Sequence, residues 1–373
     1  MIKSIKIRLF PTEEQEIIMK KSVGVSRFAY NWGLARWKEL YEKGEKVSKV
    51  IVRTEFNAMK KQEEYKWLYE VSGQVTAQAF DDLDVAFKNF FKGTAKYPSF
   101  KSKKKAKQSF YVRYDRIKLS NDTIKLEKIG KVKYKTNYDI PNLPTYVNPR
   151  CLFDGKYWYL SFGYEQEQPV NELTDETIGI DVGIKDLAIC SNGMVFKNIN
   201  KTKTVKKTEK RLRRLQRQVS RKYEMNKEGN KFVKTSNIIK LERQIKLVHR
   251  RLSNIRTNHL HQATNKIAKA KPSKVVMETL NIQGMMKNKH LSKAIAQQGL
   301  YEFKSQMQYK CKWNGIEFVE ADRFYPSSKT CSQCGHVKTK LSLSERVYKC
   351  ECCGSVIDRD LNAAINLSKY QSA

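Results

Sequence analysis

The sequence lacks any apolar run long enough to cross a bilayer, so we expect no membrane partner. It is also poor in acidic residues, with 38 Asp and Glu against 73 Lys and Arg, which gives a formal net charge of +35. A compact protein carries such a self-repelling surface readily only when a polyanion neutralises it, so nucleic acid is the expected partner. An internal repeat of solenoid period is also absent from the sequence.

Length and composition indicate a folded protein with more than one domain. The chain has 373 residues, whereas a single hydrophobic core stops growing at about 250–300 residues. Hydrophobic residues make up 40% and aromatic residues 11% of the chain, which is ample for globular cores. Residues 1–8 alternate charged with apolar residues as a strand does, unlike a secretory signal. We therefore expect a cytoplasmic protein.

A helical lobe is predicted over residues 11–104. Thr12 has the position of a helix N-cap, and Gln15, three residues later, completes a capping box. Apolar residues then recur at helical spacing, with breaks, to about Phe91, and many of them are aromatic. Such side chains could stack on nucleic-acid bases, but aromatics at helical spacing are more often core residues, so we expect most of them to pack.

A small antiparallel β-domain is predicted after this lobe, because the hydrophobic period becomes two over residues 109–163. Asp154-Gly155 is a hairpin turn between two apolar runs. The first strand, residues 1–9, cannot stand alone and is expected to complete this domain, which makes the helical lobe an insertion. Residues 166–176 are predicted to be a linker.

Two strongly basic segments are candidate nucleic-acid contacts. Five lysines fall within residues 101–107, where a phosphate contact and a solvated linker are equally good interpretations. Residues 201–222 hold eleven Lys and Arg against one acid on a helical pattern, of which one apolar stripe is expected to pack. Solvated helix faces usually mix charges of both signs, so we favour a nucleic-acid contact there. The candidate contacts are Lys101, Lys103, Lys104, Lys105, Arg211, Arg213, Arg214 and Arg217.

Two acidic residues lie on short apolar strands far apart in the chain. Asp181 is at the centre of the run Ile178 to Gly183, and Glu278 ends an apolar run that follows Pro272. A carboxylate on a buried strand costs several kcal/mol unless it is paired or bound to a metal ion. A salt bridge and a metal site are therefore the two explanations for each of these acids.

A third acidic position lies at a predicted helix start, where Asp358 and Asp360 precede an apolar helical run. Either aspartate could serve as the N-cap. Together the strand Asp, the strand Glu and the helix Asp supply hard oxygen ligands from distant segments, as two-metal phosphodiesterases do to hold Mg²⁺. Two such ions could activate a water and stabilise the leaving oxygen at phosphorus, so no Ser, Cys or His nucleophile is required.

Four of the eight cysteines form two Cys-x-x-Cys pairs separated by fifteen residues, each followed by a glycine that admits a tight turn. In a reducing compartment this spacing predicts one structural, tetrahedral Zn²⁺ site rather than two disulfides. Cys352 is a spare thiol that could compete with a neighbour for the ion. The predicted zinc ligands are Cys331, Cys334, Cys350 and Cys353.

Longer motifs extend over nearly the whole chain. They are Gly24 to Trp32, Tyr97 to Lys103, Gly179 to Gly183, Glu278 with Leu280 and Asn281, Tyr325 to Gly335, and Asp358 to Asn366. In these motifs the chain resembles the TnpB family, which bacterial insertion sequences encode and which is similar to the ancestors of type V CRISPR effectors. Thr279 departs from the family pattern, because relatives commonly carry Asp after the catalytic Glu.

The resemblance implies a multidomain α+β and α/β architecture. A wedge β-barrel would hold an inserted helical recognition lobe, and a RuvC-like nuclease domain of RNase H fold would hold a basic helical insertion and a zinc ribbon. The implied ranges are 1–10 and 105–168 for the wedge, 11–104 for the lobe, 172–328 and 356–373 for the nuclease domain, about 201–270 for its insertion, and 329–355 for the ribbon.

The family's catalytic triad matches Asp181, Glu278 and Asp360. Asp360 is chosen over Asp358, the alternative, because it directly precedes the run Leu361 to Ala364. The resemblance also implies two catalytic Mg²⁺ ions, a guide RNA transcribed from the element's end, and a double-stranded DNA target with a short adjacent motif.

The expected function is thus that of an RNA-guided DNA endonuclease, located in the bacterial cytoplasm and on the nucleoid when bound to DNA. A nuclease-inactive, RNA-guided repressor is one alternative, but such a protein should have lost an acid of the triad. A transposase acting directly on element ends is another, because a three-carboxylate site could also carry out transesterification.

Overall fold

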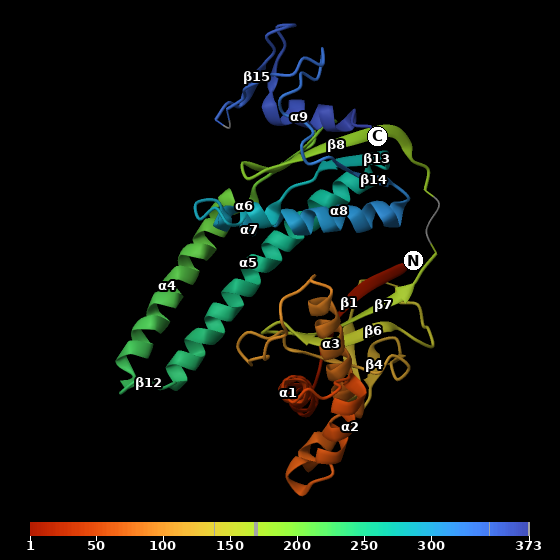
Figure 1. The fold of residues 1–373 in the computed structure, drawn as a ribbon, viewed down its shortest axis with the longest axis vertical. Helices are drawn as coiled ribbons and strands as arrows, with labels where there is room; N and C mark the ends of the chain where they lie inside the picture. The colour runs from red at the N-terminus through yellow and green to blue at the C-terminus, as the bar shows by residue number, and fades with distance from the viewer. Residues whose placement is uncertain (138, 168–170, 343, 372–373) are drawn as a thin grey trace. The chain divides into compact units, whose positions relative to one another are not determined.

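The computed structural model describes residues 1–137, 139–167, 171–342 and 344–371. The chain forms two compact units, Met1–Gln166 and Glu167–Ala373 (Figure 1). The linker predicted at 166–176 includes residues 168–170, which lie outside the described ranges, and it was predicted too long, because its last three residues, 174–176, begin a strand of the second unit. Within those ranges, every helix is too short or too polar to span a bilayer.

The first unit joins an antiparallel sheet to a set of helices. Its helical elements are α1 (Glu13–Glu42), α2 (Lys49–Met59), the 3-10 helix η1 (Glu63–Glu70) and α3 (Gly73–Phe91). Its strands are β1 (Ile2–Phe10), β2 (Ser109–Tyr111), β3 (Lys118–Leu119), β4 (Thr123–Leu126), β5 (Gly130–Lys135), β6 (Val147–Phe153) and β7 (Trp158–Glu165). β1 pairs with both β5 and β7, which confirms that the first strand completes the later sheet. β6 and β7 form the hairpin predicted at Asp154-Gly155.

The wedge β-barrel is the one architectural expectation that is wrong for this unit. The strand order is β2-β6-β7-β1-β5-β4-β3, and within the described residues no ladder joins the two outer strands, so the sheet is open. Closure requires the first and last strands of a sheet to pair, and these two are only three and two residues long. Helices α1 and α3 instead contact the outer strand β2, which covers that edge of the sheet.

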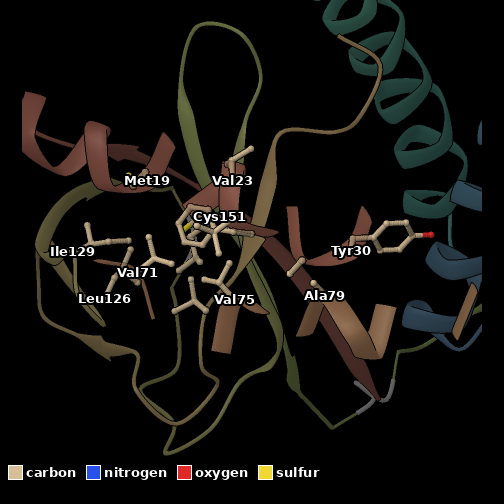
Figure 2. Close-up of a cluster of buried hydrophobic side chains, with 14 of the residues drawn as sticks. Met19, Val23, Tyr30, Val71, Val75, Ala79, Leu126, Ile129 and Cys151 are labelled. Atoms are coloured by element: carbon tan, nitrogen blue, oxygen red, sulfur yellow. The ribbon is translucent and has the colours of Figure 1, made fainter. Parts of the chain in front are cut away.

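The core of the first unit lies between the sheet and the helices. Figure 2 shows part of it, with side chains from α1, from α3 and from the strands gathered in one cluster. The predicted capping box is present, since Thr12 and Gln15 exchange hydrogen bonds at the start of α1. Most helical aromatics pack as expected, for example Phe80 and Phe87, whereas Trp67 remains 42% exposed.

The second unit is built on a mixed sheet of order β10-β9-β8-β13-β14. β8 runs parallel to β13, and β13 runs parallel to β14, whereas β9 and β10 are antiparallel. The strands are β8 (Thr174–Val182), β9 (Asp186–Cys190), β10 (Val195–Lys197), β11 (Lys227–Glu228), β12 (Lys231–Phe232), β13 (Pro272–Glu278), β14 (Glu317–Ala321), β15 (Val347–Lys349) and β16 (Val356–Asp358). The helices are η2 (Ile199–Lys201), α4 (Lys203–Met225), α5 (Ser236–Lys269), α6 (Ile282–Met285), α7 (Ser292–Gln298), α8 (Leu300–Asn314) and α9 (Arg359–Ser368).

Helices cover both faces of this sheet (Figure 1). On one face, Ile178 and Met277 of the central strands pack with residues of α5 and α8. On the other face, Val276 packs with Leu367 of α9. Successive side chains of a strand point to opposite faces, so alternate residues of β8 and of β13 pack into these two separate cores.

Helices α4 and α5 occupy the range, about 201–270, for which the family resemblance implies a basic helical insertion. They pack along one another, and the short β11–β12 hairpin joins them. Leu215 of the predicted apolar stripe is buried, which confirms that one face of α4 packs. Glu209, the single acid of that segment, accepts hydrogen bonds from Arg256 and Gln297 and so joins the start of α4 to α5 and α7.

Candidate active site

Strand β8 places Asp181 on the face of the central sheet that α9 covers. Ile178 and Ile180 point into the core formed with α5 and α8. Gly179 and Asp181 alternate with them and therefore point to the opposite face. Asp181 is partly buried, and within the described residues no group donates a hydrogen bond to its carboxylate. The predicted strand is present, but it begins earlier than expected, at Thr174, so that it also includes Asp175 and Glu176, and Asp181 lies next to its end rather than at its centre.

Strand β13 places Glu278 beside Asp181. The two strands are parallel, and their register pairs Met277 with Ile180. The next residue on each strand is an acid, so Glu278 and Asp181 occupy neighbouring positions at the carboxyl ends of adjacent strands. Since Val276 packs against α9, Glu278, two positions further on, points to the same face.

Helix α9 approaches the sheet closely at Gly179. A Cβ atom on Gly179 would lie 2.0 Å from the carbonyl oxygen of Ala364 and 2.4 Å from the amide nitrogen of Ser368. Any side chain larger than hydrogen would therefore hold the helix away from the strand. The glycine lets the backbone of α9 rest on β8, and the first turn of that helix carries Asp360.

Asp358 and Asp360 have different surroundings at the start of α9. Asp358 is the N-cap, and its Oδ1 accepts the backbone N–H groups of Asp360 and Leu361 at 3.0 and 3.1 Å. Asp360 lies one position inside the helix, and its carboxylate has no hydrogen-bond donor in the described parts of the chain. The capping role that either aspartate could fill thus belongs to Asp358.

Electrostatics indicate that the three acids share one neighbourhood. Burial raises the pKa of Asp181 well above its usual range, and the charges of Glu278 and Asp360 raise it further. The guanidinium group of Arg359 opposes this rise. None of the three carboxylates forms an ion pair within the residues described, so the salt-bridge explanation does not apply. Mutual repulsion of this kind is relieved when a cation binds.

Glu278 is held by a residue of the motif Tyr325 to Gly335 for which the sequence predicts no contact with an acid. The hydroxyl group of Ser327 donates a hydrogen bond of 2.6 Å to Oε1 of Glu278, and Ser327 is only 3% exposed. Ser327 lies 49 positions away in the chain, so no local pattern signals the contact. Thr279, the departure from the family pattern, donates its hydroxyl hydrogen to the carbonyl oxygen of Ala321 at 2.7 Å and so joins β13 to β14.

Two buried asparagines of α9 hold the segment that carries Ser327. Asn366 donates to the carbonyl oxygens of Ser327 and Thr330, at 2.7 and 2.6 Å. Asn362 donates to the carbonyl oxygen of Thr330 and accepts the backbone N–H of Ser332. We did not predict these roles, although two asparagines four residues apart on an apolar helix are a visible signal that they share one buried face.

The four predicted zinc ligands form a single cluster. The Sγ atoms of Cys331, Cys334, Cys350 and Cys353 all lie within 4.8 Å of one another, as a tetrahedral ion would require. Gly335 and Gly354 follow the two pairs with φ of +76° and +72°, a left-handed conformation that favours glycine. The cysteines are free thiols rather than disulfides, and Cys352 is not part of the cluster.

The predicted nucleic-acid contacts differ in their exposure. Lys103, Lys104 and Lys105 are exposed, but Lys101 is partly buried with its Nζ 3.5 Å from the centre of the Tyr30 ring. Burial lowers the pKa of Lys101, and Asn31 exchanges two hydrogen bonds with its backbone. The structure thus places Lys101 in the packing of the first unit. The α4 candidates are exposed without a carboxylate partner among the described residues, namely Arg211, Arg213, Arg214 and Arg217.

Comparisons with known proteins place this fold. Three family models match the chain: a helix-turn-helix domain at residues 1–46, the OrfB proteins of IS605 described as "Probable transposase" at 161–289, and the TNB domain of Cas12f1-like proteins at 301–367. A Cas12f1 structure solved with its sgRNA and target DNA has a TM-score of 0.60, at 14% identity, over 99% of this chain and 98% of its own. At that identity the match shows the fold alone.

Two curated relatives align with almost the whole chain. A "Putative RNA-guided DNA endonuclease" of Streptomyces pristinaespiralis is 33% identical, over 98% of this chain and 88% of its own length. The "Putative RNA-guided DNA endonuclease InsQ" of Escherichia coli K12 is 30% identical, over 98% of this chain and 91% of its own. The class defined by these matches is that of OrfB proteins of insertion sequences, with a Cas12f1-like fold. Within that class, the chain belongs to the TnpB family.

Proposed function

We propose that the chain is an RNA-guided DNA endonuclease of an insertion sequence, which hydrolyses phosphodiester bonds of a guide-matched DNA target. The observation that carries this proposal is that Asp181 and Glu278 occupy neighbouring strand ends on the face covered by α9, the helix that bears Asp360, and that none of the three acids has an ion pair among the described residues. The names of both relatives support the same activity. Its proposed partners are a guide RNA from the element's end and a double-stranded DNA with a short motif beside the target.

The domain organisation of the family supplies the rest of the proposal. The second unit would be a RuvC-like nuclease domain, 172–328 and 356–373, because its mixed sheet has helices on both faces and acids at the ends of adjacent strands. The cysteine cluster would make 329–355 a zinc ribbon. In the first unit, 1–10 and 105–168 would form the wedge, as an open sheet, and 11–104 the recognition lobe.

The three acids supply the ligand chemistry that two Mg²⁺ ions would use. Carboxylate oxygens are the hard ligands that Mg²⁺ prefers, and the carboxylates of Asp181 and Asp360 lack hydrogen-bond donors within the described residues. Asp181, Glu278 and Asp360 would hold the ions, which when bound would supply Lewis-acid charge to the scissile phosphate and lower the pKa of an attacking water. The four clustered thiols likewise fit one Zn²⁺ ion, whose role would be structural.

The chain's own residues have separate tasks in this site. Asp181 and Glu278 are fixed by two paired strands, so the spacing of their carboxylates depends on the sheet register. Asp360 is fixed by α9, whose approach depends on Gly179. The exposed cations of 103–105 and of α4, which have no carboxylate partner in the described part of the chain, would neutralise phosphates of the RNA or the DNA.

Replacing one acid should separate cutting from binding. The guide RNA is obtained by sequencing the RNA that co-purifies with the protein from its native host, and a plasmid with the matching target is then offered in Mg²⁺. We expect the wild-type complex to cut, and Asp181→Ala to bind the target without cutting. Undiminished cutting by Asp181→Ala would refute the assignment. Transfer of element ends by RNA-free protein would favour a transposase, and binding without cutting by the wild type would favour a repressor.

The two aspartates of α9 allow a matched control. Asp360→Asn should abolish cutting, because a neutral amide is a poor ligand for Mg²⁺. Asp358→Asn should cut at nearly the wild-type rate, because Asn caps a helix about as well as Asp. The two variants remove the same charge two positions apart, so the difference between their cleavage rates reports the site of the third ligand. The reverse order of activities would move that ligand to Asp358.

A further inference from the structure

We infer that Ser327 is a positioning residue for Glu278, and that its hydroxyl group sets which carboxylate oxygen is free to bind a cation. This inference rests on the proposed function, in which Glu278 is a metal ligand. The hydroxyl donates to Oε1 at 2.6 Å, and within the described residues Oε2 has no donor. One oxygen is therefore fixed while the other stays available.

A hydroxyl group suits this task better than a cationic side chain. A glutamate side chain has three rotatable bonds, and an unheld carboxylate at a strand end would sample several orientations. Lys or Arg would hold it too, but their charge would compete with a divalent cation for the same oxygens. The neutral hydroxyl of Ser327 restricts rotation and leaves the negative charge in place. Partners of metal ligands commonly have this role.

Ser327 is itself held on both sides. Its backbone N–H donates to the carbonyl oxygen of Tyr325 at 2.8 Å, and its carbonyl oxygen accepts the carboxamide of Asn366 at 2.7 Å. Tyr325 in turn donates its hydroxyl hydrogen to the carbonyl oxygen of Asn366 at 3.1 Å. Both Ser327 and Asn366 are 3% exposed, so water does not compete strongly for these bonds.

This arrangement ties together the elements that carry the acids. Asn366 belongs to α9, which also carries Asp360, and it donates a hydrogen bond to Ser327. Ser327 in turn donates a hydrogen bond to Glu278 on β13. Three positions beyond Ser327, Thr330 is held by Asn362 and Asn366, and Cys331 of the cysteine cluster follows it. The segment between β14 and the first cysteine therefore serves as a brace that sets Glu278 relative to Asp360.

Ser328 supplies a matched control, because it is the same residue type one position further and its hydroxyl has no hydrogen bond in the described parts of the chain. For Ser327→Ala we expect a Mg²⁺ concentration for half-maximal cleavage about 10-fold higher than for the wild type. Ser328→Ala should match the wild type, and Ser327→Thr, which keeps a hydroxyl, should recover part of the loss. Thermal unfolding and target binding should be alike in the three variants.

A second measurement does not depend on cutting. Mn²⁺ binding to the guide complex, followed by the EPR signal of the free ion, should weaken about 10-fold in Ser327→Ala and stay unchanged in Ser328→Ala. Unaltered Mn²⁺ binding in Ser327→Ala would overturn the inference even if its cleavage fell. Glu278→Gln separates the two levels of the argument. If Glu278→Gln cuts normally, the proposed site itself is wrong. If Glu278→Gln is inactive but Ser327→Ala behaves as the wild type, only the role of Ser327 is refuted.

Discussion

Gly179 of β8 lies against the backbone of Ala364 of α9, with no room between them for a side chain. A Cβ atom at Gly179 would stand 2.0 Å from the Ala364 carbonyl oxygen, a distance that real Cβ atoms do not show. The obstacle is helix backbone rather than the end of a flexible side chain, so it cannot move aside cheaply. The position of Asp360 relative to Asp181 therefore depends on a residue that has no functional group.

Gly179→Ala should impair both stability and cutting. We expect the free energy of unfolding to fall by at least about 1–3 kcal/mol, the usual cost of an overpacked core. Displacing α9 by about 1 Å should also lower the cleavage rate by roughly 100-fold, because Asp360 moves with the helix. Chemical denaturation and plasmid cleavage measure the two effects.

Gly24→Ala is the control for this substitution. Gly24 lies inside α1, and a Cβ atom added there would have open space around it, with no atom within 4 Å apart from its chain neighbours and the adjacent helix backbone. Alanine should therefore stabilise the helix by about 0.4–1 kcal/mol and leave cutting unchanged. If Gly179→Ala proved as harmless as Gly24→Ala, the close approach of α9 would not be what places Asp360.

The cysteine cluster should bind zinc through four of the five cysteines in its region. Cys331→Ser should lower the zinc content from about one ion per chain and reduce the folded fraction, because structural zinc sites contribute folding free energy directly. Cys352→Ser should keep zinc, since Cys352 is exposed and outside the cluster. Elemental analysis and near-UV circular dichroism test both. A folded, zinc-free Cys331→Ser would contradict the structural role.

The features that could be predicted from the sequence are those with a local pattern. The cysteine spacing, the capping box of Thr12 and the apolar strands around Asp181 and Glu278 each depend on residues close together in the chain. The helical basic insertion was predictable for the same reason, because amphipathic periodicity is a property of one segment.

The features that could not be predicted depend on contacts between distant segments. Ser327 contacts Glu278, which lies 49 positions away in the chain. No pattern in the surrounding sequence predicts this contact for Ser327 rather than for Ser328. Lys101 belongs to a run of lysines that looks uniformly solvated, yet Tyr30 and Asn31 draw it into the first unit. The expected barrel was wrong because closure depends on the length and pairing of the outermost strands, and the motifs that carry the family resemblance do not report this.

The arginines of α4 should contribute to nucleic-acid affinity through phosphate contacts. Arg213 and Arg217 are exposed on α4 and have no carboxylate partner in the described residues. Replacing both with Gln should weaken guide RNA binding and lower the slope of log K against log salt by about 1.4–1.8. Lys234→Gln, which removes a cation already paired with Glu242, should leave the slope unchanged. Equal slopes for all three proteins would exclude these arginines from the interface.

Lys310 should make the stability of the second unit depend on pH. It lies on α8 with 8% exposure, and its Nζ donates to the carbonyl oxygen of His261 at 2.9 Å and to Oγ1 of Thr264 at 2.7 Å. Both acceptors are uncharged, and among the described residues no carboxylate pairs with the buried ammonium group to stabilise its charge. Burial accordingly lowers the pKa of Lys310 to about 8.

The direction of the effect follows from proton linkage. An unfolded lysine has a pKa of about 10.4, so between pH of about 8 and about 10.4 the unfolded chain binds more protons than the folded one at this position. The free energy of unfolding should therefore rise with pH across that interval. The slope of this rise is set by the difference in bound protons between the two states, which is at most about one for this residue. Methionine has no titratable proton, so in the Lys310→Met variant this contribution is absent. The unfolding free energy of the variant should rise less steeply with pH than that of the wild type. Denaturant titrations of both proteins at several pH values measure the difference, and parallel curves would show that Lys310 titrates normally in the folded protein.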